Sequence, residues 1–119
     1  MRYVDGFVIA MPKKKVEAYR KIARKAGKIW LEHGALDYRE CVGADLAVDF
    51  GTPFAKLAKL KPGETVIFSW VTYRSKKHRD AVMKKVMADK RLAKEMQPGA
   101  MPFDMKRMTY GGFDVIVDL

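Results

Sequence analysis

The sequence predicts an α+β protein of the ferredoxin-like class, with the element order β-α-β-β-α-β and an antiparallel four-stranded sheet. Residues 65–73 carry the strongest strand signal, because almost all of them are β-branched or aromatic. Two stretches with helical spacing of apolar residues, 13–33 and 76–88, separate the strand-like stretches. The length of 119 residues is that of one ordinary domain, which we assign to residues 1–119.

The first half of the chain is expected to supply a strand, a helix and a second strand. Residues 2–11 alternate bulky and small apolar side chains, and Pro12 then fixes φ for the first turn of a helix. That helix is expected over 13–33, and Gly34 suits the position after its last turn. Residues 35–42 alternate in the manner of a strand.

The second half begins with a long connection, 43–61, which lacks periodicity and is expected to be functional or an interface element. After the central strand, Ser75 is a suitable N-cap for the helix at 76–88. One or two further helical turns are expected at 91–96. Residues 106–119 form the last expected strand, in which apolar side chains occupy both faces.

The pattern of apolar residues also predicts how the strands are covered. In the central strand, two alternating apolar sets point to opposite faces: Val66, Phe68 and Trp70 in one, Ile67, Val71 and Tyr73 in the other. We expect right-handed crossovers to place the first and third strands side by side and parallel at the centre of the sheet. Because two helices cover only one face, the second face is expected to pack sheet to sheet against a second copy, as a homodimer of the dimeric α/β-barrel kind.

Composition limits the classes of function. The chain carries 24 Lys and Arg against 14 Asp and Glu, a net charge of +10 that attracts nucleic acid, anionic lipid or phosphorylated metabolites. No apolar run approaches the roughly 20 residues of a membrane-spanning helix, and the N-terminus lacks the apolar core of a signal peptide. One cysteine and two histidines argue against a disulfide and a metal site. A cytoplasmic protein with no metal or cofactor is expected.

Cations cluster in two places along the sequence. If the first and third strands run parallel, both helices begin at one edge of the sheet, where Lys13, Lys14, Lys76 and Lys77 would hold a phosphate or carboxylate. The alternative is a set of ordinary solvated lysines, which cost little. A basic stripe on the first helix suits either a nucleic-acid backbone or, as the better interpretation, a solvated face: Arg20, Lys21, Arg24, Lys25 and Lys28.

Several motifs carry a family resemblance: YVDGF at 3–7, EHGA at 32–35, YREC at 38–41, LKPGET at 60–65, MPFD at 101–104 and KRMTYGGF at 106–113. Together they resemble the YbaA-like family of bacterial domains of unknown function, over essentially the whole chain. The resemblance implies a dimeric α/β-barrel. It implies no established activity and no catalytic residues.

Asp5 is the main candidate for a catalytic group, because burial of this mid-strand carboxylate would raise its pKa as a general base requires. The polar residues His33 and Tyr110 are the other catalytic candidates. Tyr38, Glu40 and Trp70 are expected to share the same cavity as ligand-binding residues. The alternative has Asp5 bonded to a tyrosine hydroxyl or a cation across the dimer interface, with His33 serving as a helix cap.

The leading functional hypothesis is therefore a homodimer that binds or transforms a small molecule, with one pocket per subunit. A cofactor-independent oxygenase or isomerase is the enzyme class that this kind of barrel suggests by analogy. Two alternatives stay open at this stage: association with RNA through the basic helix faces, and a regulatory or scaffolding dimer without a ligand. The sequence alone does not decide whether the protein is an enzyme.

Overall fold

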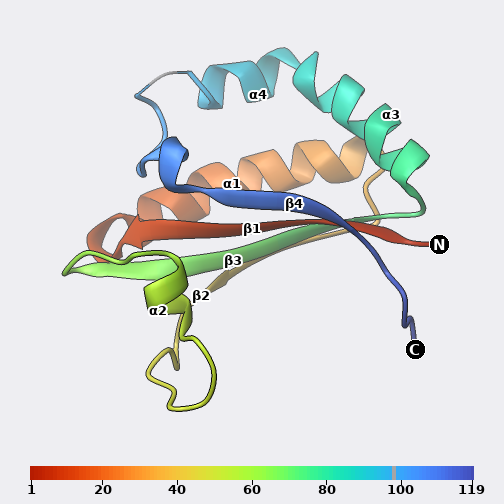
Figure 1. The fold of residues 1–119 in the computed structure, drawn as a ribbon. Coiled ribbons are helices and arrows are strands. Elements are labelled where there is room, and N and C mark those ends of the chain that lie inside the picture. The colour runs from red at the N-terminus through yellow and green to blue at the C-terminus, as the bar shows by residue number, and fades with distance from the viewer. Residues whose placement is uncertain (98) are drawn as a thin grey trace.

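A computed structural model describes residues 1–97 and 99–119 as one four-stranded sheet with its long helices on one face (Figure 1). The elements, in chain order, are β1 (Tyr3–Pro12), a 3-10 turn (Lys13–Lys15), α1 (Val16–Glu32), β2 (Asp37–Val42), α2 (Phe54–Leu57), β3 (Glu64–Tyr73), α3 (Lys76–Met87), α4 (Lys90–Glu95), a 3-10 turn (Met105–Arg107) and β4 (Thr109–Asp114). The strand order β2-β3-β1-β4 confirms the predicted ferredoxin-like class.

Every neighbouring pair of strands is antiparallel, including the two central ones. β1 and β3 pair from Tyr3 opposite Tyr73 to Pro12 opposite Glu64, so the parallel pairing predicted for them is wrong. The crossover through α1 makes β1 parallel to β2, and β3 then turns back from β2 into the space between them. The handedness rule therefore applies to β1 and β2, which are not neighbours in the sheet.

The expected boundaries of α1 are close to those observed. Pro12 has φ −57°, and the chain enters α1 through one 3-10 turn. The helix buries one face against the sheet: Tyr19, Ala23, Ala26, Gly27, Ile29 and Trp30. It ends at His33, and Gly34 follows with φ +113°, a conformation that glycine adopts without a steric penalty.

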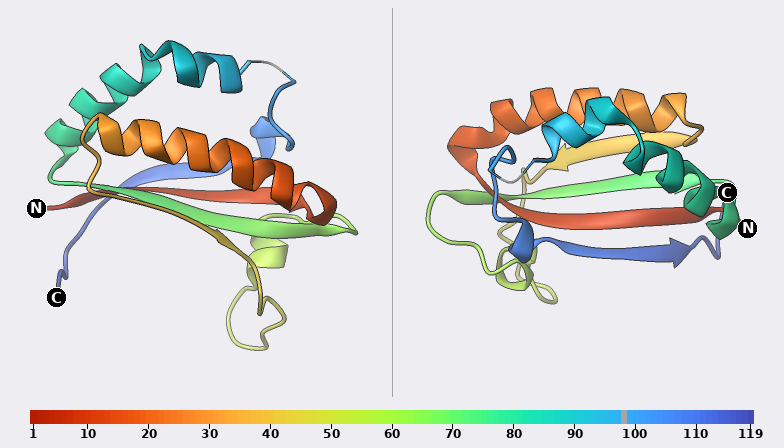
Figure 2. Two further views of the ribbon diagram at one scale, coloured as in Figure 1. Left: turned by 180° about the vertical axis from the view of Figure 1, so that it is seen from behind. Right: turned by 90° about the horizontal axis from the view of Figure 1, so that it is seen from above.

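The second helical region is divided by Asp89. Ser75 Oγ accepts a hydrogen bond from the backbone N–H of His78 at 3.0 Å, which confirms the predicted cap of α3. Asp89 then caps α4 by accepting from the N–H of Arg91 at 2.9 Å. The two short helices therefore follow one another over the same face of the sheet as α1 (Figure 2).

The last strand is shorter than predicted. β4 covers Thr109–Asp114 instead of 106–119, because a 3-10 turn precedes it and residues 115–119 leave the sheet. Arg107 in this turn is fixed by two hydrogen bonds to the Glu64 carboxylate, at 2.7 and 2.8 Å. No helix in the described residues is long and apolar enough to cross a membrane.

In the single chain, α1, α3 and α4 cover one face of the sheet. The other face, called the helix-free face below, carries none of these helices; only the four-residue α2 lies on it (Figure 1), where the Phe54 ring is 6.0 Å from that of Phe68. Alternate residues of β3, from Thr65 to Tyr73, lie under the helices and are buried, as the strand pattern predicts. The opposite set includes Phe68, of which 44% is exposed, and β4 adds Phe113 at 60%. A trough of about 630 Å³ runs along this helix-free face, lined mainly by Val4, Val8, Phe68, Trp70 and Phe113.

Candidate functional site

A half-open cavity of about 130 Å³, called the internal cavity below, lies between the sheet, α1, α4 and the segment that leads to β4. Side chains of the sheet and of α1 line its lower part, including Phe7, Ile9, Tyr19 and Trp30. Four methionines and a phenylalanine contribute to its outer wall: Met96, Met101, Phe103, Met105 and Met108. Thioether side chains are flexible and polarisable, so this wall can adapt to an apolar ligand.

Two carboxyl groups line this cavity. Glu95, at the end of α4, pairs with Lys25 at 3.5 Å, and the other carboxyl group is that of Glu40 on β2. Its Oε1 accepts a hydrogen bond from the Tyr19 hydroxyl at 2.8 Å, and its Oε2 accepts one from Tyr38 at 2.7 Å. Tyr19 comes from α1, and Ser69 on the neighbouring strand lies opposite Glu40. These elements place three hydroxyl groups around one carboxyl in mainly apolar surroundings.

The environment of Glu40 changes its acidity. Burial raises the pKa of Glu40 above its ordinary value, and the hydrogen bonds from Tyr38, Tyr19 and Ser69 oppose this effect without cancelling it. Burial and the adjacent Glu40 carboxyl also raise the pKa of Tyr19 and Tyr38, so both hydroxyls stay protonated and donate. The Glu40 carboxyl, with its two tyrosine donors, is therefore a group that can take up or release a proton at the wall of the cavity.

Asp5 lies in a second cluster, above β1 and toward the start of α3. Arg79 Nη1 donates to Asp5 Oδ1 at 2.6 Å and to the Tyr110 hydroxyl at 3.2 Å, and the guanidinium lies 4.9 Å from the centre of the Tyr3 ring. Only 1% of Asp5 is exposed. Burial raises the pKa of Asp5, whereas the charge of Arg79 and hydrogen bonds from Tyr73 and Tyr110 oppose that rise.

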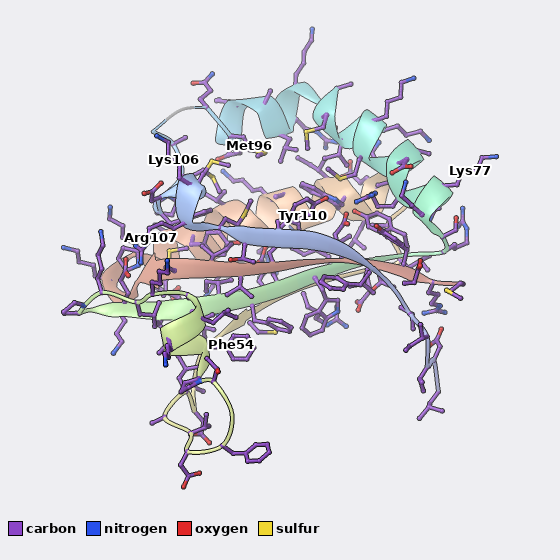
Figure 3. The ribbon with its side chains drawn as sticks, viewed as in Figure 1. Phe54, Lys77, Met96, Lys106, Arg107 and Tyr110 are labelled. Atoms are coloured by element: carbon purple, nitrogen blue, oxygen red, sulfur yellow. The ribbon has the colours of Figure 1, made fainter. Side chains whose placement is uncertain are left out.

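Two of the three predicted catalytic residues, Asp5 and Tyr110, are thus brought together, because Arg79 donates hydrogen bonds to both. Figure 3 shows Tyr110 on the helix side of β4, where its ring stacks on Phe7 at 4.9 Å. The cation belongs to the same chain, whereas the sequence suggested one across an interface. Neither Asp5 nor Tyr110 lines the internal cavity, and the Asp5 carboxylate is already paired with Arg79. We interpret this cluster as structural.

His33 lies apart from both clusters, at the C-terminal end of α1. Its Nε2 is 2.9 Å from Asp89 Oδ2, and Arg91 joins the same Asp89 carboxylate to Glu32. His33 therefore takes part in a charged link between α1 and the N-terminus of α4, and it also occupies the C-cap position of α1. It does not line the internal cavity.

The predicted ligand-binding residues of the sheet all line the internal cavity. Tyr38 and Glu40 line the internal cavity, which does not include Asp5, whereas the sequence predicted one cavity shared with Asp5. Trp70 also contributes to the lining of the internal cavity, and its ring lies 5.6 Å from that of Phe68 on the helix-free face.

The four lysines do not converge. Because β1 and β3 are antiparallel, Lys13 and Lys14 follow one end of the central pair, and Lys76 and Lys77 follow the other. The two pairs are separated by the length of a ten-residue strand, about 33 Å. The anion site predicted from them is therefore wrong.

The sequence reasoning missed the groups that complete the cavity. Tyr19 is one of the buried residues of α1, and its hydrogen bond to Glu40 joins residues 21 positions apart, a contact that no local pattern indicates. Met96, Met101, Met105 and Met108 lie outside the α-helices and strands, where periodicity does not show which side chains face the cavity. In the described residues, no group of three or more His, Cys, Asp or Glu side chains is arranged to hold a metal ion.

The strand order and the layer of helices on one face define the protein as a ferredoxin-like α+β domain with the fold of the NIPSNAP domains. It superposes on an uncharacterized NIPSNAP domain protein from Burkholderia xenovorans with a TM-score of 0.59 and 18% identity, over 95% of this chain and 93% of that chain. Residues 2–105 match the family described as "Protein of unknown function (DUF1428)", and the chain belongs to this family. It is 48% identical over 118 residues to the uncharacterized protein YbaA of Escherichia coli K12, and equally to that of Shigella flexneri, with 99% of each chain covered.

Proposed function

We propose that the protein binds a small, largely apolar molecule in the internal cavity and holds its one polar group through Glu40. The observation that supports this proposal is the Glu40 carboxyl in a mainly apolar cavity wall, where it is held by hydroxyl donors, whereas the second carboxyl, Glu95, is paired with Lys25. Binding sites of this kind combine an apolar lining with a few placed polar groups. A volume of about 130 Å³ is close to that of an engineered apolar cavity of ~150 Å³ that accepts benzene.

The ligand would reach Glu40 without displacing the tyrosines. A carboxylate has about four acceptor positions, and Tyr19 and Tyr38 use one on each oxygen. A ligand hydroxyl can therefore donate to a free position. Because the surroundings are apolar, this hydrogen bond is worth more than in water.

The test compares toluene with p-cresol, which differ by one hydroxyl, by NMR of the methionine methyl groups. We expect saturable shifts of Met96, Met101, Met105 and Met108, which line the cavity, and none of the exposed Met1. p-Cresol should bind about tenfold more tightly than toluene, the effect of one hydrogen bond of ~1.4 kcal/mol. Glu40→Gln should reduce that preference. Shifts spread over all methionines, or no shift at millimolar ligand, would reject the proposal.

Proton transfer at Glu40 is a second candidate function, favoured by the raised pKa of its carboxyl beside two tyrosine donors. A base in such a setting can remove a proton α to a carbonyl, and a tyrosine hydroxyl that turns from Glu40 to the enol oxygen can stabilise it. The assay is exchange of the α-protons of 2-butanone with D₂O, followed by NMR. Exchange should be lost in Glu40→Gln, and a rate equal to that of buffer would exclude this chemistry for the probe.

We also propose that the functional unit is a homodimer packed through the helix-free faces of the two sheets. Two ten-residue strands and two six-residue strands, ~4.8 Å apart, span about 500 Å² of projected face, the larger part of the ~800 Å² that each partner buries in a stable interface. Exposed aromatic side chains on this face, Phe68 and Phe113, support the assignment. Light scattering should report a monomer for Phe113→Asp and a dimer for Met87→Asp, because Met87 is an exposed residue of α3. A wild type that is monomeric at micromolar concentration would refute the proposal.

A further inference from the structure

The segment 115–119, Val-Ile-Val-Asp-Leu, is an apolar strand-like sequence without a sheet. It leaves β4 and runs down the helix-free side of the molecule (Figure 1). Ile116 is 85% exposed and Val117 70% exposed. Two contacts hold the segment: the Val115 N–H donates to the carbonyl of Arg2 at 2.9 Å, and Arg2 lies 3.5 Å from the Asp118 carboxylate. Such a segment is a candidate for pairing with another chain.

The free edge of β2 offers matching backbone groups. The Gly43 N–H donates to the carbonyl of Val66 at 2.8 Å. Because hydrogen-bonded residues alternate along an antiparallel pair, the odd residues of β2, including Cys41, bond to β3. The N–H and C=O groups of Tyr38, Glu40 and Val42 therefore point outward from the sheet, an edge open to strand addition.

A groove of about 480 Å³ runs between this edge and α1. Leu31 and Val42, both half-exposed, are part of its lining. Three cations of α1 line the same groove at intervals of four residues, about 6 Å of helix rise: Arg20, Arg24 and Lys28. The groove therefore suits an extended segment with an apolar residue and an acidic residue on one side.

We propose that residues 115–119 of a second copy add to the edge of β2 as an antiparallel fifth strand, an inference that rests on the proposed homodimer. Every pair in this sheet is antiparallel, and antiparallel ladders are slightly the more stable kind. Ile116 and Asp118 then face α1, where Asp118 meets the row of cations. The other three residues face the helix-free side and extend the apolar dimer interface: Val115, Val117 and Leu119.

The chain cannot make this contact with its own β2. In the order β2-β3-β1-β4 the edge of β2 is three strand spacings from β4, about 14 Å. A five-residue segment extends about 17 Å, so crossing the sheet would leave almost no residues to pair with β2. In a face-to-face dimer, by contrast, the segment already lies on the side of the second copy.

The single cysteine of the chain makes the proposal testable by cross-linking. Cys41 uses its backbone groups toward β3, so a residue directly opposite it on the outer edge is in a non-hydrogen-bonded pair, with Cα atoms ~4.5 Å apart. A disulfide accepts that separation. Cysteine is introduced singly in the full-length chain, at the odd positions Val115→Cys, Val117→Cys and Leu119→Cys and at the matched even positions Ile116→Cys and Asp118→Cys.

Under mild oxidation we expect a covalent dimer from the odd position that lies opposite Cys41, at least about tenfold faster than from either even position, because the other odd positions are displaced by two residues along the strand. Mass spectrometry should find the disulfide between the introduced cysteine and Cys41 of the other copy. Cys41→Ser should abolish it. If light scattering reports a dimer but no cross-link forms, or if odd and even positions cross-link equally, the proposed strand addition is wrong. The proposed homodimer is not contradicted by that result. A monomer by light scattering overturns both proposals.

Discussion

The ion pair between Arg79 and Asp5 allows the most direct test of how this fold is stabilised. Asp5 is 1% exposed, and its carboxylate is neutralised by one guanidinium at 2.6 Å. Arg79→Met keeps much of the apolar stem of the side chain and removes the charge. The variant therefore leaves a buried carboxylate with hydrogen-bond donors but no cation.

Removing one partner of a buried pair costs about 3–5 kcal/mol, because the remaining charge is desolvated without compensation. For a chain of this size, 1 kcal/mol corresponds to roughly 3–6 °C, so the melting temperature should fall by roughly 9–30 °C. Asp5→Asn should cost less, since the tip of Arg79 is near the surface and can turn to solvent. The double variant should lose less than the sum of the two single losses.

The assay is thermal unfolding by circular dichroism as a function of pH, with the exposed Lys77→Met as control. Asp5 has a raised pKa when folded, so the folded state keeps its proton to higher pH than the unfolded chain, and this carboxyl costs stability as the pH rises. Loss of Arg79 enlarges that cost. The loss of melting temperature caused by Arg79→Met should therefore be largest near pH 7. It should shrink toward pH ~4, the pKa of an aspartate in the unfolded chain. A deficit of a few degrees at most, or one independent of pH, would refute the reasoning.

Three further changes test other parts of the structure. Gly27→Ala should destabilise the fold by about 1–2 kcal/mol despite the better helix propensity of alanine, because its Cβ would lie 2.7 Å from the Tyr38 ring. Urea unfolding measures this change, and an increase in the free energy of unfolding would contradict the prediction. Ser75→Ala should cost about 1 kcal/mol through loss of the α3 cap, and Ser75→Asp should restore it, again by urea unfolding. Hydrogen bonds from Arg107 lower the pKa of Glu64 to about 2, so stability should fall as the pH drops from 4.5 toward 2, and Arg107→Met should flatten that slope.

The sequence was sufficient for the order of the elements because the signals are local. Ser75 caps α3, Gly34 follows α1, and the alternation in β3 separates the buried set from the one that includes Phe68. The end of β4 was not predictable in the same way. Residues 115–119 have the composition of a strand, and whether they pair depends on a neighbour that composition does not specify.

The direction of each strand and the grouping of the polar side chains both depend on the topology of the sheet. The wrong direction predicted for one strand therefore led to a second wrong prediction. Treating β1 and β3 as a parallel pair brought Lys13 and Lys76 to one edge, whereas the antiparallel pairing separates them by the length of the sheet. Asp5, Tyr110, Tyr38 and Glu40 could be chosen as candidate site residues from the sequence, because each is a polar side chain in a mostly apolar strand. Their division into separate clusters follows from which helix covers which strand.

Two carboxyls, the buried Asp5 and the partly buried Glu40, differ in a way that assigns them different roles. Asp5 is paired with a permanent cation, and protonation of its carboxylate would break the ion pair that fixes α3 to the sheet. Glu40 is held by neutral hydroxyl donors, so it can gain or lose a proton while the hydroxyls of Tyr19 and Tyr38 rotate to suit either state. A group used for ligand binding or proton transfer needs that freedom. The cavity therefore lies beside the carboxyl that can change its protonation, and the ion pair holds the framework around it.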